Sequence, residues 1–209
     1  DRVKGLVNPE NNWILGNAMQ AEALKGLTSR VDESRILQEP FGKNTAACMA
    51  WGAFEVLKED PNAICVMVSA DAWIHPVAAF EDTIRAAVKH VEAHDQVTII
   101  GIPPTRPHTG YGYIKTKTVP ESELAIVQVD SFKEKPDLRT ALQYVESGDY
   151  YWNAGIFVLK AQTLVQALQD FMPDHYSIIK SYTDKGLRLP TDIAAYYEKL
   201  DPVSIDYGI

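Results

Sequence analysis

The chain has 209 residues, 46% of them hydrophobic and 23% charged, a composition that fits a globular protein with a sizeable core and excludes a disordered chain. A formal net charge of -8 and a pI of about 5.1, with no basic run, argue against a nucleic-acid-binding protein. No apolar run reaches the roughly 18 residues that cross a bilayer, and the N-terminus DRVKGLVNPE lacks the apolar region of a signal peptide, so we expect a cytoplasmic protein without a membrane partner.

Short apolar runs alternate with helix-length amphipathic segments in the first half of the chain, which is typical of an α/β fold. The run AICVMVS is apolar on both faces, as expected of a strand in the middle of a parallel sheet, and carboxyl ends of such strands are where ligands bind. Strands are predicted at residues 13–16, 35–38, 63–69 and 97–102, and helices at residues 18–25, 45–59 and 76–94.

The second half begins with a segment rich in Pro, Gly and Thr and continues with further strands and helices. Asp137 is a suitable N-cap for one of these helices, and Gly148 is a suitable stop for it. We find no internal repeat and no linker, so we expect one domain. Strands are predicted at residues 112–118, 125–133 and 153–160, and helices at residues 136–147, 162–171, 174–185 and 191–199.

The two cysteines lie in apolar stretches. Cys48 is part of AACMAW and Cys65 is part of AICVMV. In such surroundings a cysteine is usually a small buried hydrophobe, so we predict neither a disulfide nor a metal site from this pair.

Two segments in the first half carry residues suited to an anionic ligand. The run EPFGKNT joins a strand to a helix, whose free N–H groups favour an anion, and a simple capped loop is the alternative. Asp71 follows the tip of a predicted strand, where a carboxylate can hold Mg²⁺ together with substrate phosphates or can cap a helix. The candidate residues of the first run are Glu39, Gly42, Lys43, Asn44 and Thr45.

Two segments in the second half carry residues suited to a sugar phosphate. Gly110 and Gly112 in TGYGY would let a ligand approach the backbone closely, although a tight hairpin explains them equally well. Glu134 and Lys135 could bind a sugar hydroxyl and a phosphate, or form a solvated surface pair. Asn153 offers both a donor and an acceptor to vicinal hydroxyls.

The order and spacing of these segments resemble the bacterial mannose-1-phosphate guanylyltransferase family. The resemblance covers nearly the whole chain and rests above all on GIPPTRPHTGYGYI and YYWNAGIF, together with EPFGKNT, VMVSAD, FKEKPD and SIDY. It implies the α/β fold of nucleotide-diphosphosugar transferases, a three-layer, Rossmann-like mixed sheet with flanking helices.

The resemblance also implies a reaction, in which GTP and α-D-mannose 1-phosphate give GDP-mannose and pyrophosphate with Mg²⁺ as cofactor. The sugar phosphate attacks the α-phosphorus of GTP, so catalysis rests on positioning and on neutralisation of phosphate charge and needs no protein nucleophile. The oligomeric state stays open, with a homodimer as one alternative.

Individual positions match the family's functional residues. Asp71 resembles the family's Mg²⁺-binding Asp, and Glu134 and Lys135 match the pair that contacts sugar and phosphate, which makes Asp71 and Lys135 the candidate catalytic residues. Asn153 matches the sugar-binding Asn, and Gly110 matches the glycine whose backbone faces the sugar. The segment that lines the nucleotide corresponds to Glu39, Gly42, Lys43, Asn44 and Thr45.

The sequence departs from the family pattern in several places. The G-G-x-G-T-R-L loop that holds the triphosphate is not found, and the resemblance places it upstream, while a later metal-binding Asp would lie downstream. We therefore expect residues 1–209 to be a nucleotidyltransferase domain that is incomplete at both ends, inactive alone and weak in binding Mg-GTP. The family's Ala-Asp-His reads A-D-A at residues 70–72, and its Asn-Ser-Gly reads N-A-G at residues 153–155.

Other hypotheses remain open at this point. The chain could be a noncatalytic nucleotide-sugar-binding or regulatory subunit, and its sheet should then be continuous. An incomplete domain should instead leave the strands at residues 13–16 and 63–69 with unpaired inner edges. A third hypothesis keeps the enzyme and changes the sugar or the nucleotide. Glu39 bears on the base, because a carboxylate can accept from both N1–H and N2–H₂ of guanine, whereas uracil or thymine offers one donor.

Overall fold

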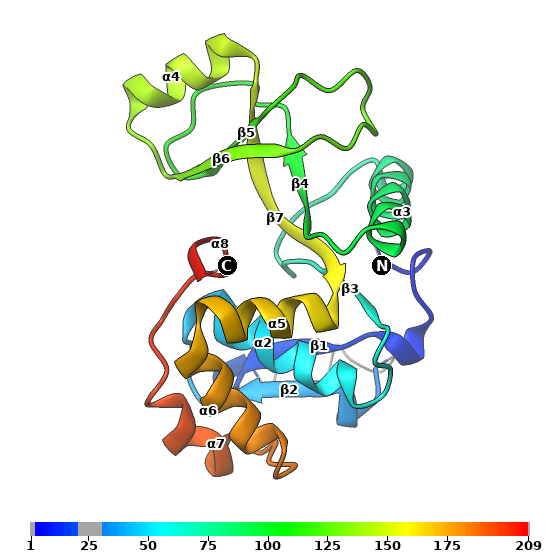
Figure 1. The fold of residues 1–209 in the computed structure, drawn as a ribbon, viewed down its shortest axis with the longest axis vertical. Helices are drawn as coiled ribbons and strands as arrows, with labels where there is room; N and C mark the ends of the chain where they lie inside the picture. The colour runs from blue at the N-terminus through cyan, green and yellow to red at the C-terminus, as the bar shows by residue number, and fades with distance from the viewer. Residues whose placement is uncertain (1–2, 21–30, 209) are drawn as a thin grey trace. The chain divides into compact units, whose positions relative to one another are not determined.

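The computed structural model describes residues 3–20 and 31–208, and the chain divides into two compact units. The first unit consists of Asp1–Cys65 with Leu159–Ile209, and the second of Val66–Val158. Helices are combined with parallel and antiparallel strands in the chain (Figure 1), so the predicted mixed α/β fold is confirmed. The extent of the domain stays a prediction.

The first unit contains a two-stranded parallel sheet. β1 (Ile14–Asn17) pairs with β2 (Ile36–Glu39), so that the last residues of the two strands, Asn17 and Glu39, lie opposite each other. After β1 the chain forms a short 3₁₀ helix, η2 (Ala18–Gln20). The remainder of the helix predicted at residues 18–25 lies outside the described residues.

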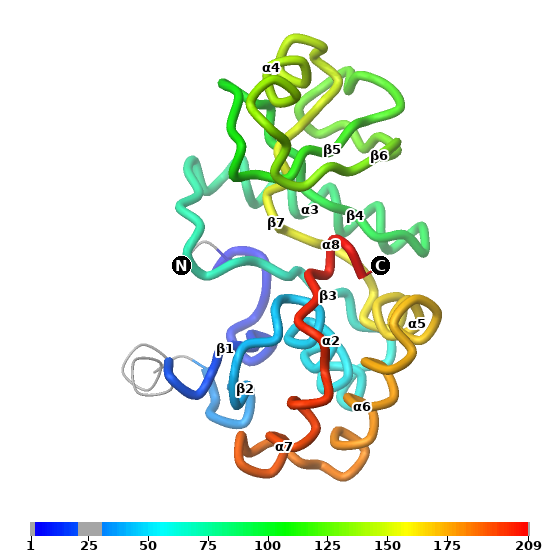
Figure 2. The backbone as a smooth tube through the Cα atoms, turned by 90° about the vertical axis from the view of Figure 1, so that its left-hand side faces the viewer, coloured from blue at the N-terminus to red at the C-terminus, as the bar shows by residue number. Residues whose placement is uncertain are grey.

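A layer of helices completes the first unit. The long helix α2 (Asn44–Leu57) follows β2 and packs against α5 (Ala161–Phe171) and α6 (Pro173–Thr183), as Figure 2 shows. The chain then continues with α7 (Pro190–Tyr197) and α8 (Ile205–Gly208). Segments more than 100 residues apart in sequence therefore form one helical layer.

Aromatic rings fill the centre of this helical layer. Trp51 of α2 packs edge-on against Tyr182 of α6 and Tyr197 of α7, with ring centroids 5.7 and 6.2 Å away. All three side chains are fully buried. Edge-on contacts between buried rings stabilise a core beyond simple area burial, so these residues hold α2, α6 and α7 together.

The second unit is built around a sheet with antiparallel pairing. The hydrogen-bonded order is β3 (Ile64–Met67), β7 (Tyr150–Lys160), β5 (Gly112–Thr116) and β6 (Val129–Glu134), and β4 (Thr98–Ile102) also pairs with β7. The β4–β7, β5–β7 and β5–β6 pairs are antiparallel. Two of these strands, β3 and β7, also run into the first unit at one end.

The helices of the second unit are α3 (Val77–Ala93) and α4 (Leu138–Ser147). The Asp137 side chain accepts the Thr140 N–H at 2.8 Å, and Gly148 ends α4 with a φ of 77°, so both predicted end signals are confirmed. Across residues 3–20 and 31–208, none of the helices has the length and apolarity that a transmembrane span requires.

The two sheets share no ladder within the part of the chain that the structure describes. β1 pairs only with β2 there, and β3 is the end strand of the other sheet. The residues of β3 are accordingly half-buried, which corrects the expectation of a strand buried on both faces.

Both cysteines are free and half-buried. Burial raises the pKa of Cys48 to about 12, helped by the nearby Glu39, and raises the pKa of Cys65 to about 11. Thiols with such pKa values stay protonated at neutral pH, which fits the predicted role as small hydrophobic residues.

Candidate functional site

Glu134 lies across the start of β5 in the second unit. It ends β6 and sits directly opposite Gly112 in the antiparallel ladder. A Cβ atom placed on Gly112 would lie 2.6 Å from Glu134 Oε2 and 2.8 Å from the Phe132 ring. The missing side chain of Gly112 therefore makes room for the Glu134 carboxylate, a role that the sequence did not reveal.

Lys135 forms a tight turn immediately after β6. Its φ is +44°, in the left-handed region, and its N–H donates to the Tyr111 carbonyl at 3.1 Å. Its ammonium pairs with Glu134 Oε1 at 3.2 Å, and the Lys135 side chain is 64% exposed. The ammonium is thus accessible to a phosphate, beside the backbone of the glycine-rich segment.

Gly110 is held by a neighbouring histidine. The Gly110 N–H donates to His108 Nδ1 at 3.0 Å, and the His108 ring stacks on Tyr111 with centroids 4.0 Å apart. The Tyr113 hydroxyl donates to the His108 carbonyl at 3.1 Å. Because the Gly110 N–H is engaged, the carbonyl is the backbone group that Gly110 can offer to a ligand. His108, which holds this N–H, was not among the predicted residues.

Asn153 lies on the strand next to β5. Trp152 is opposite Tyr113 in the β5–β7 ladder, so the next residue along β7, Asn153, continues toward the Gly112 end of β5. The Asn153 Oδ1 accepts the Gly155 N–H at 2.9 Å, which fixes the amide group.

Asp71 follows the end of β3 and is exposed. A Cβ atom on Gly155 would lie 4.0 Å from Ser69 Oγ, so the chain after β3 passes beside Gly155, two residues from Asn153. The second unit thus joins Gly110, Glu134 and Lys135 in one turn region. Convergence of Asp71 and Asn153 with them on a single cleft stays a prediction.

Substitution of Gly112 tests this packing. Gly112→Ala should destabilise the protein by about 1–3 kcal/mol, because the added methyl group overlaps Glu134 and Phe132. Gly42→Ala is the matched control, since a Cβ at Gly42 meets nothing within 4 Å and should change stability by less than about 0.5 kcal/mol. Urea unfolding of the two variants measures the difference, and equal losses would contradict the assigned role of Gly112.

The predicted nucleotide segment lies in the first unit, at the start of α2. Asn44 has a φ of +66°, and its Oδ1 accepts the Thr45 N–H at 2.8 Å. The Lys43 ammonium donates to the carbonyls of Glu198 and Leu200, beyond the end of α7. Lys43 therefore has a structural contact that its sequence context did not indicate, while Gly42, Asn44 and Thr45 are exposed.

Glu39 is buried at the end of β2, with 7% of its surface exposed. Burial raises the pKa of its carboxyl to about 7, and the nearby Tyr197 hydroxyl and Cys48 thiol oppose this shift. No donor reaches hydrogen-bond geometry at Glu39 Oε1 within residues 3–20 and 31–208. A buried carboxylate oxygen without a donor is costly, and a ligand N–H would satisfy it.

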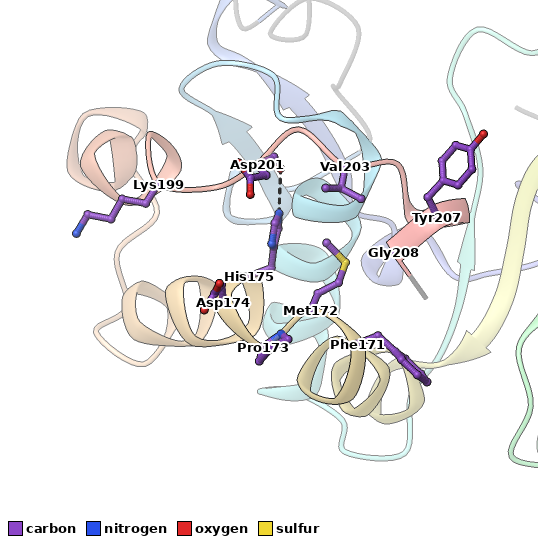
Figure 3. Close-up of a pocket in the computed structure, with 10 residues that line it drawn as sticks. All are labelled: Phe171, Met172, Pro173, Asp174, His175, Lys199, Asp201, Val203, Tyr207 and Gly208. Atoms are coloured by element: carbon purple, nitrogen blue, oxygen red, sulfur yellow. Dashed lines mark hydrogen bonds between the residues drawn. The ribbon is translucent and has the colours of Figure 1, made fainter.

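A cavity of about 340 Å³ also lies in the first unit (Figure 3). Residues from the α5–α6 corner, the segment after α7 and α8 line it, and His175 Nε2 donates to the Asp201 carbonyl beside it at 2.9 Å. None of the predicted site residues lines this cavity. We assign it no part in the candidate site.

Residues 7–193 match the nucleotidyl transferase family, and the chain belongs to that family. It is 34% identical over 197 residues to a mannose-1-phosphate guanylyltransferase of Escherichia coli, which covers 90% of this chain and 42% of that protein. It is 31% identical over 205 residues to the alginate biosynthesis protein AlgA of Pseudomonas aeruginosa, covering 97% of this chain and 41% of that protein. The chain thus spans less than half the length of these curated relatives.

A solved structure is similar over the whole chain. It is described as mannose-1-phosphate geranyltransferase from Thermus thermophilus, and it aligns with a TM-score of 0.84 and 28% sequence identity, covering 100% of this chain and 58% of that one. The expected resemblance to mannose-1-phosphate guanylyltransferases is therefore confirmed.

Proposed function

We propose that the protein transfers a guanylyl group from GTP to α-D-mannose 1-phosphate, with GDP-mannose and pyrophosphate as products. The observation that carries the proposal is the turn in which the exposed Lys135 ammonium and the Glu134 carboxylate lie beside the backbone of Tyr111 and Gly112. A cation and a hydrogen-bond acceptor side by side suit the phosphate and a hydroxyl group of one sugar phosphate. Similarity to mannose-1-phosphate guanylyltransferases supports the choice of substrates.

The residues of the second unit would orient the attacking sugar phosphate. Lys135 would neutralise the phosphate, Glu134 would accept a hydrogen bond from a sugar hydroxyl, and the amide of Asn153 would bind a further hydroxyl. The attacking oxygen belongs to the substrate and the leaving group is pyrophosphate, so the protein provides position and charge rather than a nucleophile.

Asp71 would hold Mg²⁺ together with the substrate phosphates. Its carboxylate is exposed after β3, and no group of three or more metal-ligating side chains occurs within the described ranges. A single exposed carboxylate fits Mg²⁺, which proteins commonly bind through one or two carboxylates plus phosphate oxygens. When bound, the ion would supply charge neutralisation on the phosphates.

Glu39 would read the base. Its buried Oε1 has no donor in the described part of the chain, and the paired donors N1–H and N2–H₂ of guanine would provide one for each carboxylate oxygen. Uracil would leave one oxygen without a donor, which favours GTP over UTP.

Pyrophosphate release tests the proposed function. The complete reading frame that contains residues 1–209, expressed and incubated with GTP and Mg²⁺, should release pyrophosphate when mannose 1-phosphate is added, and should release less with glucose 1-phosphate. Lys135→Ala should reduce the rate by about 100-fold, because it removes the charge that faces the phosphate. Absence of release with either sugar, combined with binding of GDP-mannose, would instead favour a noncatalytic nucleotide-sugar-binding protein.

A further inference from the structure

The start of α2 is held by a segment that lies about 160 residues later in the sequence. The Ala46 N–H donates to the Val203 carbonyl at 3.1 Å, and the Ile205 N–H donates to Thr45 Oγ1 at 2.9 Å. Both contacts lie within the first unit, and α2 also packs against α8. The backbone of residues 203–205 is therefore fixed directly to the predicted nucleotide segment.

A chain of hydroxyl groups continues from this contact and has a defined direction. Ser204 Oγ donates to Asp206 Oδ2 at 2.7 Å, because an ionised carboxylate only accepts. Ser204 has then used its one proton, so at the 3.4 Å contact with Thr45 Oγ1 it is the Thr45 hydroxyl that donates. The order is Thr45 to Ser204 to Asp206, and a chain that ends on a carboxylate is charge-assisted.

The hydroxyl chain adds to a local hydrogen bond at the start of α2. Asn44 adopts a left-handed conformation with φ +66°, and its Oδ1 accepts the Thr45 N–H at 2.8 Å. The Thr45 hydroxyl is fixed on both sides, as acceptor from Ile205 and as donor to Ser204. The first turn of α2 is consequently held in one conformation, although Asn44 and Thr45 are exposed to solvent.

We propose that Ser204 and Asp206 are positioning residues for the guanine nucleotide. They act through Thr45, by fixing its side chain and the backbone at the start of α2. This inference rests on the proposed function, because it assumes that the segment from Gly42 to Thr45 meets the nucleotide. It gives a role to the SIDY sequence at residues 204–207.

Ser204→Ala tests the inference by removing the middle of the hydroxyl chain. The dissociation constant for GTP should rise by about five- to tenfold, which is the loss expected when one ordered hydrogen-bond chain is broken. The dissociation constant for mannose 1-phosphate should stay within about twofold, because its predicted contacts lie elsewhere in the chain. Chemical-shift titration of the full chain measures both constants, even for weak binding.

Two further variants separate positioning from general destabilisation. Ser204→Thr keeps the hydroxyl and should restore GTP binding to within about twofold of wild type. Ser181→Ala is the matched control, since its hydroxyl donates to the Ile178 carbonyl within α6 at 2.7 Å, and it should leave both constants unchanged. Equal weakening of both ligands by Ser204→Ala, or unchanged GTP binding, would overturn the inference. A wild-type chain that binds mannose 1-phosphate and not GTP would instead overturn the nucleotide assignment on which it rests.

Discussion

Glu55→Gln should lower the free energy of unfolding by about 3 kcal/mol, because it removes the charge at the centre of a buried ion-pair cluster. Glu55 is fully buried in α2, where Oε1 accepts the Lys58 ammonium at 2.7 Å and Oε2 accepts the Arg188 Nε–H at 2.9 Å. The same two cations donate to the carbonyls of Thr183 and Ser34, each at 2.8 Å. One carboxylate thus links α2 to the end of α6 and to the segment before β2.

The expected loss is at the lower end of the range for a broken buried pair. The side chains of Lys58 and Arg188 are 41% and 37% exposed, so both cations can regain water when the carboxylate is gone. Glu59→Gln is the matched control: Glu59 pairs with Arg35 at 2.7 Å, but its side chain is 47% exposed, and its loss should cost less than about 0.5 kcal/mol. Urea unfolding compares the variants, and similar losses for both would refute the role of Glu55.

The local part of the fold could be predicted from the sequence. Apolar periodicity and end signals located α4 with its Asp137 cap and Gly148 stop, and α5 differs from its predicted range by one residue. Strand ends were less accurate. β7 begins at Tyr150 rather than at residue 153 because Tyr150 pairs with Lys115 of β5, and a pairing partner 35 residues away leaves no local signal.

The site shows the same division between local and distant information. The residue types in the motifs indicated which side chains could bind a phosphate or a sugar. Their contacts could not be predicted, because the partners are distant: Lys43 meets the Glu198 carbonyl, and Glu134 lies over Gly112. Burial of Glu39 was equally hidden, since it depends on how α2 and α7 pack around the end of β2.

Glu39→Gln should change the pH dependence of stability. Burial raises the pKa of Glu39 from 4.5 to about 7, so between these values the folded protein holds a proton that the unfolded chain releases. Stability is therefore lost as the pH rises from about 4.5 to 7, by about 3 kcal/mol in total at 1.36 kcal/mol per unit of pKa. Glutamine does not ionise, so the variant should gain about 2–3 kcal/mol over wild type between pH 5 and pH 8.

Urea unfolding of wild type and variant at pH 5, 6.5 and 8 measures this change, and taking the difference at each pH cancels every other titrating group. Glu121→Gln, which alters an exposed carboxylate, should show a difference that does not vary with pH. A constant difference for Glu39→Gln would mean that water reaches the carboxylate and that its pKa is close to 4.5.

The same variant also tests the proposed recognition of guanine. Because the amide of glutamine cannot accept from both guanine donors, the preference of Glu39→Gln for GTP over UTP should be lower than that of wild type. An unchanged preference would remove Glu39 from base recognition and leave its effect on stability intact.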